Sequence, residues 1–172
     1  MMSRTSIQTL MIAMILAGCG GPTVKEKPQA TGQESPVIER RLQDSQLFAA
    51  SFNRVWNAVV ETLSEMNYPV ESMERENGSV TIKSMNVGEK PIRKGLGRIS
   101  TMPSITGGVW SRGWYSLSIF VTPGGKNRTN VRITTHIEGY ESKVSDGWHI
   151  CYSNGFLEKQ FFNSVESKLA SK

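Results

Sequence analysis

Aromatic residues are absent from the first 47 positions of this 172-residue chain, and all 14 of them lie at or beyond Phe48. Aromatic side chains supply much of the apolar area that a small core buries. A folded domain is therefore expected over residues 47–172, a length that is enough for one hydrophobic core. The apolar content of 38% and the charged content of 20% fit one globular domain with additional segments.

The first 18 residues have the pattern of a secretory signal peptide. Arg4 is the only charged residue before an apolar run over residues 10–16, and this run is far shorter than the ~20 residues that span a bilayer. The sequence Leu16-Ala-Gly-Cys19 resembles the lipobox of bacterial lipoproteins. The resemblance implies cleavage after Gly18 and acylation of Cys19 on its sulfur and on the new amino terminus.

The lipobox also implies a location. In enterobacterial lipoproteins an aspartate after the lipidated cysteine favours retention at the inner membrane, and Gly20 stands at that position here. We therefore expect a protein anchored by several acyl chains in the outer membrane, with its domain facing the periplasm. Cys151 is then the one remaining thiol; a buried, inert side chain is favoured, and a reactive or intermolecular thiol is the alternative.

Residues 19–46 are predicted to form a flexible tether. They contain three prolines, three glycines and equal numbers of acidic and basic residues, so they bury too little apolar surface to offset the loss of chain entropy. A coil of this length reaches about 30 Å, which would let the domain work at a short distance from the membrane. A strip that orders when it binds a partner is the alternative for this segment.

Hydrophobic periodicity predicts an antiparallel sheet and two helices. Helical spacing of apolar residues runs over 52–66 and again from about residue 153 to 169, whereas alternation predicts strands over 115–121 and 131–137. The dipeptide Asn77-Gly78 predicts a hairpin between two further strands. The predicted fold class is therefore α+β, a two-layer sandwich in which two amphipathic helices cover one face of an antiparallel sheet.

Residues 86–108 break the periodic pattern and are predicted to form a long loop. This loop carries four cations, Lys90, Arg93, Lys94 and Arg98, against the single acid Glu89. Cations among glycines can surround an anionic group, and in the periplasm the phosphates of lipopolysaccharide or the carboxylates of peptidoglycan are better candidates than nucleic acid. A solvated loop is the alternative. Three residues that follow are candidate partner contacts or, alternatively, core residues: Trp110, Arg112 and Trp114.

The sequence lacks the patterns that catalysis or metal binding would need. His136 and His149 are its two histidines, and no CxxC or HExxH motif accompanies them. No Gly-x-Ser-x-Gly motif marks a hydrolase nucleophile. We therefore expect no enzymatic activity, no metal and no cofactor, and a hydrolase acting on peptidoglycan or lipid is only a third alternative.

The segment from Phe52 to Tyr68, together with Val70 and residues 78–82, resembles the domains of the BamC (NlpB/DapX) lipoproteins. The shared pattern is an aromatic-x-x-Val-Trp helix, an exit through Asn-Tyr-x-Val and an acidic hairpin before a strand. The resemblance implies a helix-grip fold and an accessory role around the machinery that assembles outer-membrane β-barrels. BamC carries two such domains whereas this chain has room for one, and the BamC segment that docks on its partner has no match in residues 19–46.

These observations lead to two functional expectations. The first is a non-enzymatic outer-membrane lipoprotein that scaffolds a complex of envelope proteins. The second is a module that binds an anionic envelope polymer through Lys90, Arg93, Lys94 and Arg98. Both expectations place the membrane anchor at Cys19.

Overall fold

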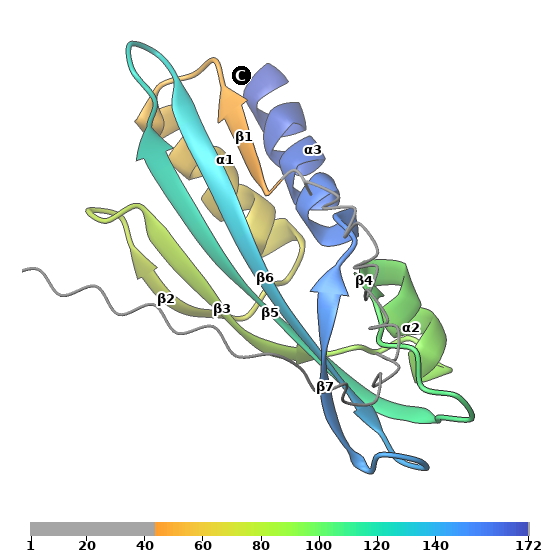
Figure 1. The fold of residues 1–172 in the computed structure, drawn as a ribbon. Helices are drawn as coiled ribbons and strands as arrows, with labels where there is room; N and C mark the ends of the chain where they lie inside the picture. The colour runs from red at the N-terminus through yellow and green to blue at the C-terminus, as the bar shows by residue number, and fades with distance from the viewer. Residues whose placement is uncertain (1–43, 172) are drawn as a thin grey trace, which may run out of the picture. The chain divides into compact units, whose positions relative to one another are not determined.

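A seven-stranded antiparallel sheet with three helices packed against it makes up the fold (Figure 1), so the predicted α+β class with an antiparallel sheet is confirmed. This computed structural model describes residues 44–171; Cys19, the expected signal peptide and nearly all of the expected tether lie outside that range. The sheet order is β2-β3-β5-β6-β7-β4, and β1 pairs with β6. In chain order the elements are β1 (Ser45–Phe48), α1 (Phe52–Glu65), β2 (Val70–Glu74), β3 (Ser79–Asn86), α2 (Ile92–Ile99), β4 (Ser100–Thr101), β5 (Trp110–Pro123), β6 (Thr129–Glu141), β7 (Gly147–Ser153) and α3 (Phe156–Ala170).

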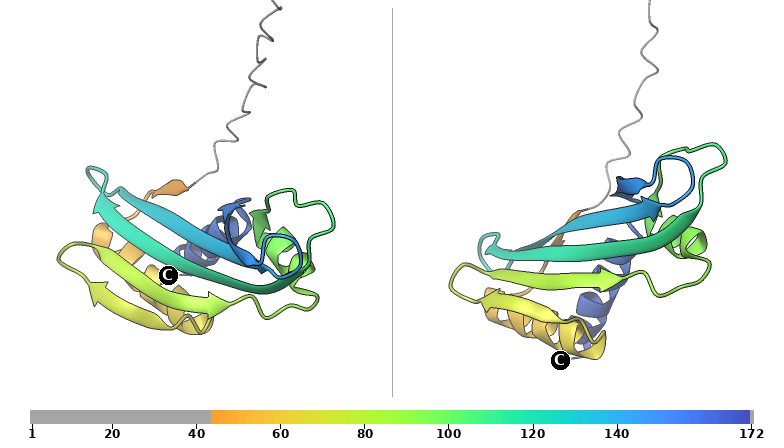
Figure 2. Two further views of the ribbon diagram at one scale, coloured as in Figure 1. Left: turned by 60° about the horizontal axis from the view of Figure 1, so that its bottom comes forward. Right: turned by 90° about the horizontal axis from the view of Figure 1, so that it is seen from below.

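The core lies between one face of the sheet and the helices α1 and α3. Figure 2 shows both helices on the same side of the long β5–β6 hairpin. Alternate residues of β5 and β6 point to this side, so most of them are buried while their neighbours are exposed or half-buried. Fully buried members of the core include Val55, Val59 and Leu63 of α1, Leu117, Ile119, Ile133 and Ile137 of the sheet, and Phe161 and Val165 of α3.

The prediction of a loop over residues 86–108 is wrong for residues 92–99, which form the third helix, α2. Its two glycines, Gly95 and Gly97, are poor helix formers. The helix instead depends on Leu96, which is fully buried against Gly113 of β5 and Gly139 of β6, two cross-strand partners. A Cβ atom at either glycine would lie within 3.0 Å of a Leu96 methyl group. Tertiary docking therefore forms a helix that local sequence disfavours.

Gly139→Ala should destabilise the domain by about 2 kcal/mol, because overpacking a filled core typically costs 1–3 kcal/mol. The added Cβ would lie 2.7 Å from two ring atoms of Trp110 and 2.8 Å from Leu96. Urea denaturation measures the change. Gly147→Ala is the matched control, since its nearest neighbour lies at 3.6 Å and we expect a change within about 0.5 kcal/mol. Equal effects of the two substitutions would contradict the docking role of Gly139.

Other sequence predictions hold with adjusted boundaries. The hairpin at Asn77-Gly78 is confirmed, and Asn67 ends the α1 turn with a positive φ of 52°. Helix α3 begins at Phe156, a few residues later than predicted; Gly155 is its cap residue, and the Asn154 side chain accepts the Phe156 N–H. Strands β4 and β7 were not predicted. Strand β1 begins at residue 45, inside the segment expected to be a tether, because its backbone pairs with β6.

None of the helices within residues 44–171 has the length and apolar character that crossing a membrane requires.

Candidate functional site

The sheet face opposite α1 and α3 carries a cluster of aromatic and apolar side chains, which we call the aromatic platform. It is formed on neighbouring strands by Arg112 and Trp114 of β5, Tyr140 of β6, and Trp148, Ile150 and Tyr152 of β7. Trp148, Ile150 and Tyr152 alternate along β7 and are 43%, 58% and 73% exposed. Large apolar side chains gathered on one exposed face are typical of a surface that another molecule covers.

Strand register aligns the platform residues in two rows. Arg112 pairs with Tyr140, and Tyr140 pairs with Trp148, so these three side chains lie next to one another across the sheet. Trp114 and Ile150 flank Glu138 in the adjacent row. Cross-strand neighbours on one face are close enough for their side chains to touch. The platform therefore depends on the pairing of three strands.

Contacts between the rings hold the first row in place. The Arg112 guanidinium lies 4.1 Å from the centre of the Tyr140 ring and 5.4 Å from that of Trp148, and the two rings meet edge-on at 5.3 Å. The Tyr140 hydroxyl donates a hydrogen bond of 2.6 Å to Asp146. This hydrogen bond and desolvation raise the pKa of Tyr140, so the phenol stays neutral. The cation and the rings are thus ordered before any partner arrives.

A buried carboxylate fixes the turn that joins β6 to β7. Glu141 is fully buried and accepts hydrogen bonds of 2.6–2.9 Å from the backbone N–H groups of Val109, Lys143, Val144 and Ser145. Burial alone would raise the pKa of Glu141, but the backbone hydrogen bonds outweigh it and hold the pKa well below its usual range. The charged carboxylate therefore sets the turn that carries Asp146 and leads into the platform strand β7.

The structure separates the three predicted contact residues that follow the loop. Arg112 and Trp114 lie on the platform, as a contact role requires. Trp110 is buried on the other side of the sheet and packs edge-on against His149 at 5.7 Å, which favours the alternative given for it, a core residue. The platform residues of β6 and β7 were missed, although Trp148-x-Ile150-x-Tyr152 is an alternating apolar pattern that could have indicated them.

The four predicted cations do not form one anion site. Glu89 pairs with Lys94 at 2.9 Å and with Arg98 at 3.7 Å, and these two contacts, with the hydrogen bond to Lys94 the strongest cause, lower the pKa of Glu89. Lys90 and Arg93 form no ion pair with any residue in the range 44–171. Arg93 lines a separate pocket with Trp110 and residues 102–105. Two of the four predicted cations therefore share one carboxylate within the fold.

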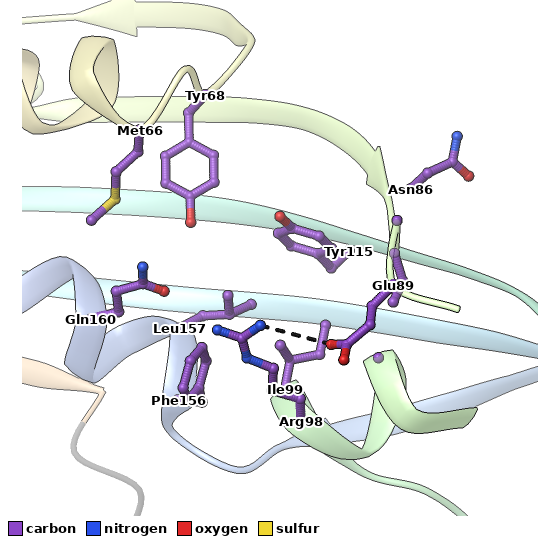
Figure 3. A pocket seen from close by; sticks show the side chains of 13 residues that line it. Met66, Tyr68, Asn86, Glu89, Arg98, Ile99, Tyr115, Phe156, Leu157 and Gln160 are labelled. Atoms are coloured by element: carbon purple, nitrogen blue, oxygen red, sulfur yellow. Dashed lines mark ion pairs between the residues drawn. The ribbon is translucent and has the colours of Figure 1, made fainter. Parts of the chain in front are cut away.

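A pocket of about 360 Å³ lies where the end of α1, the end of β3, helix α2 and the start of α3 meet (Figure 3). Its lining joins Arg98 and Glu89 to side chains that sequence reasoning did not single out, among them Tyr68, Tyr115 and Gln160. Burial is the main cause that raises the pKa of Tyr68 to about 12, with the phenol of Tyr115 and the carboxylate of Glu158 contributing, and burial also raises the pKa of Tyr115. Both phenols are therefore neutral hydrogen-bond donors.

Ser145, His149 and Glu141 have the residue types of a catalytic triad, but their hydrogen bonds are not arranged as in a triad. The Ser145 hydroxyl donates to Glu141 at 2.9 Å and lies 2.7 Å from Nε2 of His149. Because the Ser145 proton goes to the carboxylate, the imidazole does not activate the hydroxyl as a nucleophile.

Burial raises the pKa of Cys151, which keeps that thiol protonated. Within residues 44–171, no three histidine, cysteine or acidic side chains gather as metal ligands would.

Comparison with known proteins finds no family model that matches this chain and no curated protein that is significantly similar to it. The geometry of the platform and of the pocket therefore has to carry the functional conclusion.

Proposed function

We propose that this chain is a lipid-anchored, non-enzymatic subunit of an outer-membrane protein complex, and that the aromatic platform is its contact surface for a partner protein. The observation that carries the proposal is the ordered row of Arg112, Tyr140 and Trp148 beside exposed Ile150 and Tyr152. The lipobox at Cys19 supports the membrane anchor, and the resemblance of residues 52–68 to BamC domains supports the accessory role.

The residue types of the aromatic platform and the fixed orientation of its side chains both favour a protein partner. Tryptophan, tyrosine and arginine are the residues most enriched where a few side chains dominate binding free energy. Stacking on Tyr140 holds the Arg112 side chain in one orientation, so less conformational entropy is lost when it binds. An exposed tryptophan and tyrosine offer apolar area with little rotamer freedom to lose. The platform thus has the composition of an interface centre.

Charge indicates the chemistry of the partner. Residues 47–172 contain 15 basic and 11 acidic residues, and Arg112 is the cation at the platform itself. A partner surface with an apolar centre, a carboxylate that reaches Arg112 and a donor or cation opposite Glu138 would complement this face. We therefore propose an acidic envelope protein, rather than a second copy of this basic domain, as the occupant.

The test compares two single variants that each remove an exposed aromatic ring from the same sheet face. Trp148→Ala removes a platform ring, whereas Phe120→Ala removes a 42% exposed ring from β5, far along that strand from Arg112 and Trp114. Full-length tagged chains are recovered from detergent-solubilised membranes, and co-purified proteins are quantified. We expect a stoichiometric partner with Phe120→Ala and an at least tenfold loss with Trp148→Ala, as for a residue at the centre of an interface.

Arg112→Glu adds a test of charge. It should weaken capture of the partner as strongly as Trp148→Ala does, because the new glutamate would face the carboxylate of the partner. Retention of the partner by both platform variants, or recovery of no stoichiometric protein from the unmodified chain, would overturn the proposal. Sedimentation of the purified chain distinguishes a second copy, since dimers lost in Trp148→Ala would identify self-association instead.

A further inference from the structure

One wall of the pocket between α1, α2 and α3 is formed by apolar side chains of the core. Val87, Ile99 and Leu157 are buried members of the core that line it, and Met66 and Phe156 are partly buried beside them. Its volume of about 360 Å³ lies near the lower end of the range of ~300–1,000 Å³ that small-molecule sites occupy. The cavity therefore suits a small ligand with an apolar body.

Polar groups converge on this cavity from four separate segments. Figure 3 shows the Tyr68 hydroxyl, the Gln160 amide and the Arg98 guanidinium directed into the space, with Tyr115 beside them. Neither tyrosine hydroxyl has a hydrogen-bond partner among residues 44–171, and both phenols remain protonated because burial raises the pKa of each. A neutral phenol and a guanidinium both donate hydrogen bonds. These donors suit a ligand group that accepts several hydrogen bonds.

Arg98 can reach a ligand without leaving its acidic neighbour unpaired. Its contact with Glu89 is long, at 3.7 Å, and Lys94 holds the other carboxylate oxygen of Glu89 at 2.9 Å. The Arg98 guanidinium lies 4.7 Å from the centre of the Phe156 ring, which supports it over the cavity. A guanidinium has five N–H donors, so most of them stay available for a ligand. Lys94 would continue to neutralise Glu89 if Arg98 turned toward an anion.

Because two acidic side chains, Glu89 and Glu158, lie near the pocket, the affinity for an anionic ligand depends on Arg98. Glu89 lines the pocket, and the buried Glu158 carboxylate close to Tyr68 accepts hydrogen bonds from the hydroxyls of Thr135 and Ser153. Both negative charges oppose a second anion, so a ligand carboxylate depends on Arg98 and on the tyrosine donors to bind.

We propose that this pocket binds a small amphiphile of the medium-chain fatty-acid class, with its carboxylate held by Arg98, Tyr68 and Tyr115 and its chain packed against Met66, Phe156 and Leu157. The site is separate from the aromatic platform and shares no residue with it. Of the four predicted cations, only Arg98 would contact the ligand in this proposal.

Decanoate, which has twelve non-hydrogen atoms, is the probe for this site. The full chain carrying Cys19→Ser, which cannot be lipidated at that residue, is titrated with carboxyl-labelled ¹³C-decanoate and followed by NMR and calorimetry. We expect saturable binding of one decanoate per chain and at least tenfold weaker binding of 1-decanol, which lacks the carboxylate. Tyr115→Phe should weaken decanoate binding about tenfold, as expected for the loss of a hydrogen bond to a charged group.

Matched charge variants of α2 and its neighbour Glu89 separate the role of Arg98 from general electrostatics. Arg98→Gln should weaken decanoate binding at least tenfold and leave 1-decanol binding unchanged, whereas Arg93→Gln on the same helix should change neither. Glu89→Gln should strengthen decanoate binding several-fold, because it removes the competing carboxylate. Since Arg98 and Arg93 are both exposed, their substitution should leave the thermal unfolding curve in place.

Three results would overturn the proposal. They are the absence of saturable decanoate binding, equal binding of decanoate and 1-decanol, and equal losses in Arg98→Gln and Arg93→Gln. Trp148→Ala should bind decanoate normally, so failure of this proposal and failure of the platform proposal are distinguishable.

Discussion

Replacing Glu141 with glutamine is expected to lower the melting temperature of the domain on the order of 10 °C at neutral pH. Each carboxylate oxygen accepts at least two backbone N–H groups, so either orientation of the glutamine amide turns an NH₂ group toward donors that it cannot accept from. Leaving buried donors without an acceptor is more costly than losing an exposed hydrogen bond. Because Glu141 holds the β6–β7 turn, the variant should also disturb the Tyr140–Asp146 hydrogen bond.

This effect should depend on pH with a defined sign. The folded state holds the pKa of Glu141 well below its ordinary value of 4.5, so the carboxylate stabilises the fold above that pH. As the pH falls below about 4.5, the unfolded chain takes up a proton that the folded chain does not, and the stabilisation is progressively lost. The difference in melting temperature between the unmodified protein and Glu141→Gln should therefore shrink between pH 7 and pH 3.

Glu138→Gln is the control for this prediction. It makes the same chemical change on the same strand, but its carboxylate is partly exposed and contacts only His136 among the ion pairs of residues 44–171. We expect a change of about 2 °C or less, because exposed ion pairs contribute little to stability. Melting curves at several pH values measure both variants. A Glu141→Gln effect that is small at pH 7, or equally large at pH 3, would show that the buried carboxylate does not organise the turn.

Gly78→Ala is expected to cost about 3 kcal/mol of stability or more, which few single substitutions do. Gly78 ends the β2–β3 hairpin turn with a positive φ of 63°, and an added Cβ would lie 2.0 Å from the carbonyl oxygen of Val121. The Gly78 carbonyl also accepts the Val121 N–H at 2.7 Å. Because the obstructing atom belongs to the backbone, no change of rotamer relieves the clash. The hairpin would have to move away from β5.

Gly107→Ala separates this clash from the cost of the backbone conformation. Gly107 also has a positive φ, of 73°, but an added Cβ there meets nothing within 4 Å. We expect it to cost about 1 kcal/mol, the penalty of placing an L-residue in the left-handed region. Urea denaturation of both variants measures the difference. If the two costs are equal, the close approach of the hairpin to β5 does not contribute to stability.

Elements whose signals are local were predictable from the sequence. Helix α1 follows from apolar residues at helical spacing, and the hairpin follows from Asn77-Gly78, since positive φ is a property of the turn itself. The alternation in β5 and β6 identified their buried faces in the same way. The close approach of Gly78 to Val121 was not predictable, because it joins residues 43 positions apart.

The candidate sites depended on contacts between distant segments. Arg112 and Trp114 could be selected as aromatic and cationic residues near a loop, but the register of β5 with β6 and β7 decides that Tyr140 and Trp148 lie beside them. The pocket draws Tyr68, Arg98, Tyr115 and Gln160 from four segments, and no spacing in the sequence links them.

The sequence by itself determined the α+β class, the absence of aromatic side chains before Phe48, the pattern of the lipobox and the total charge. These are properties of composition and of short-range periodicity. Only the tertiary structure decided that residues 92–99 form a helix, that Trp110 is buried and that Glu89 pairs with two of the four predicted cations. The helix and the burial of Trp110 both depend on packing against Gly139 of β6, a segment that is distant in the sequence. Glu89 is only five and nine positions from Lys94 and Arg98, but these pairs depend on the helix that the same packing forms.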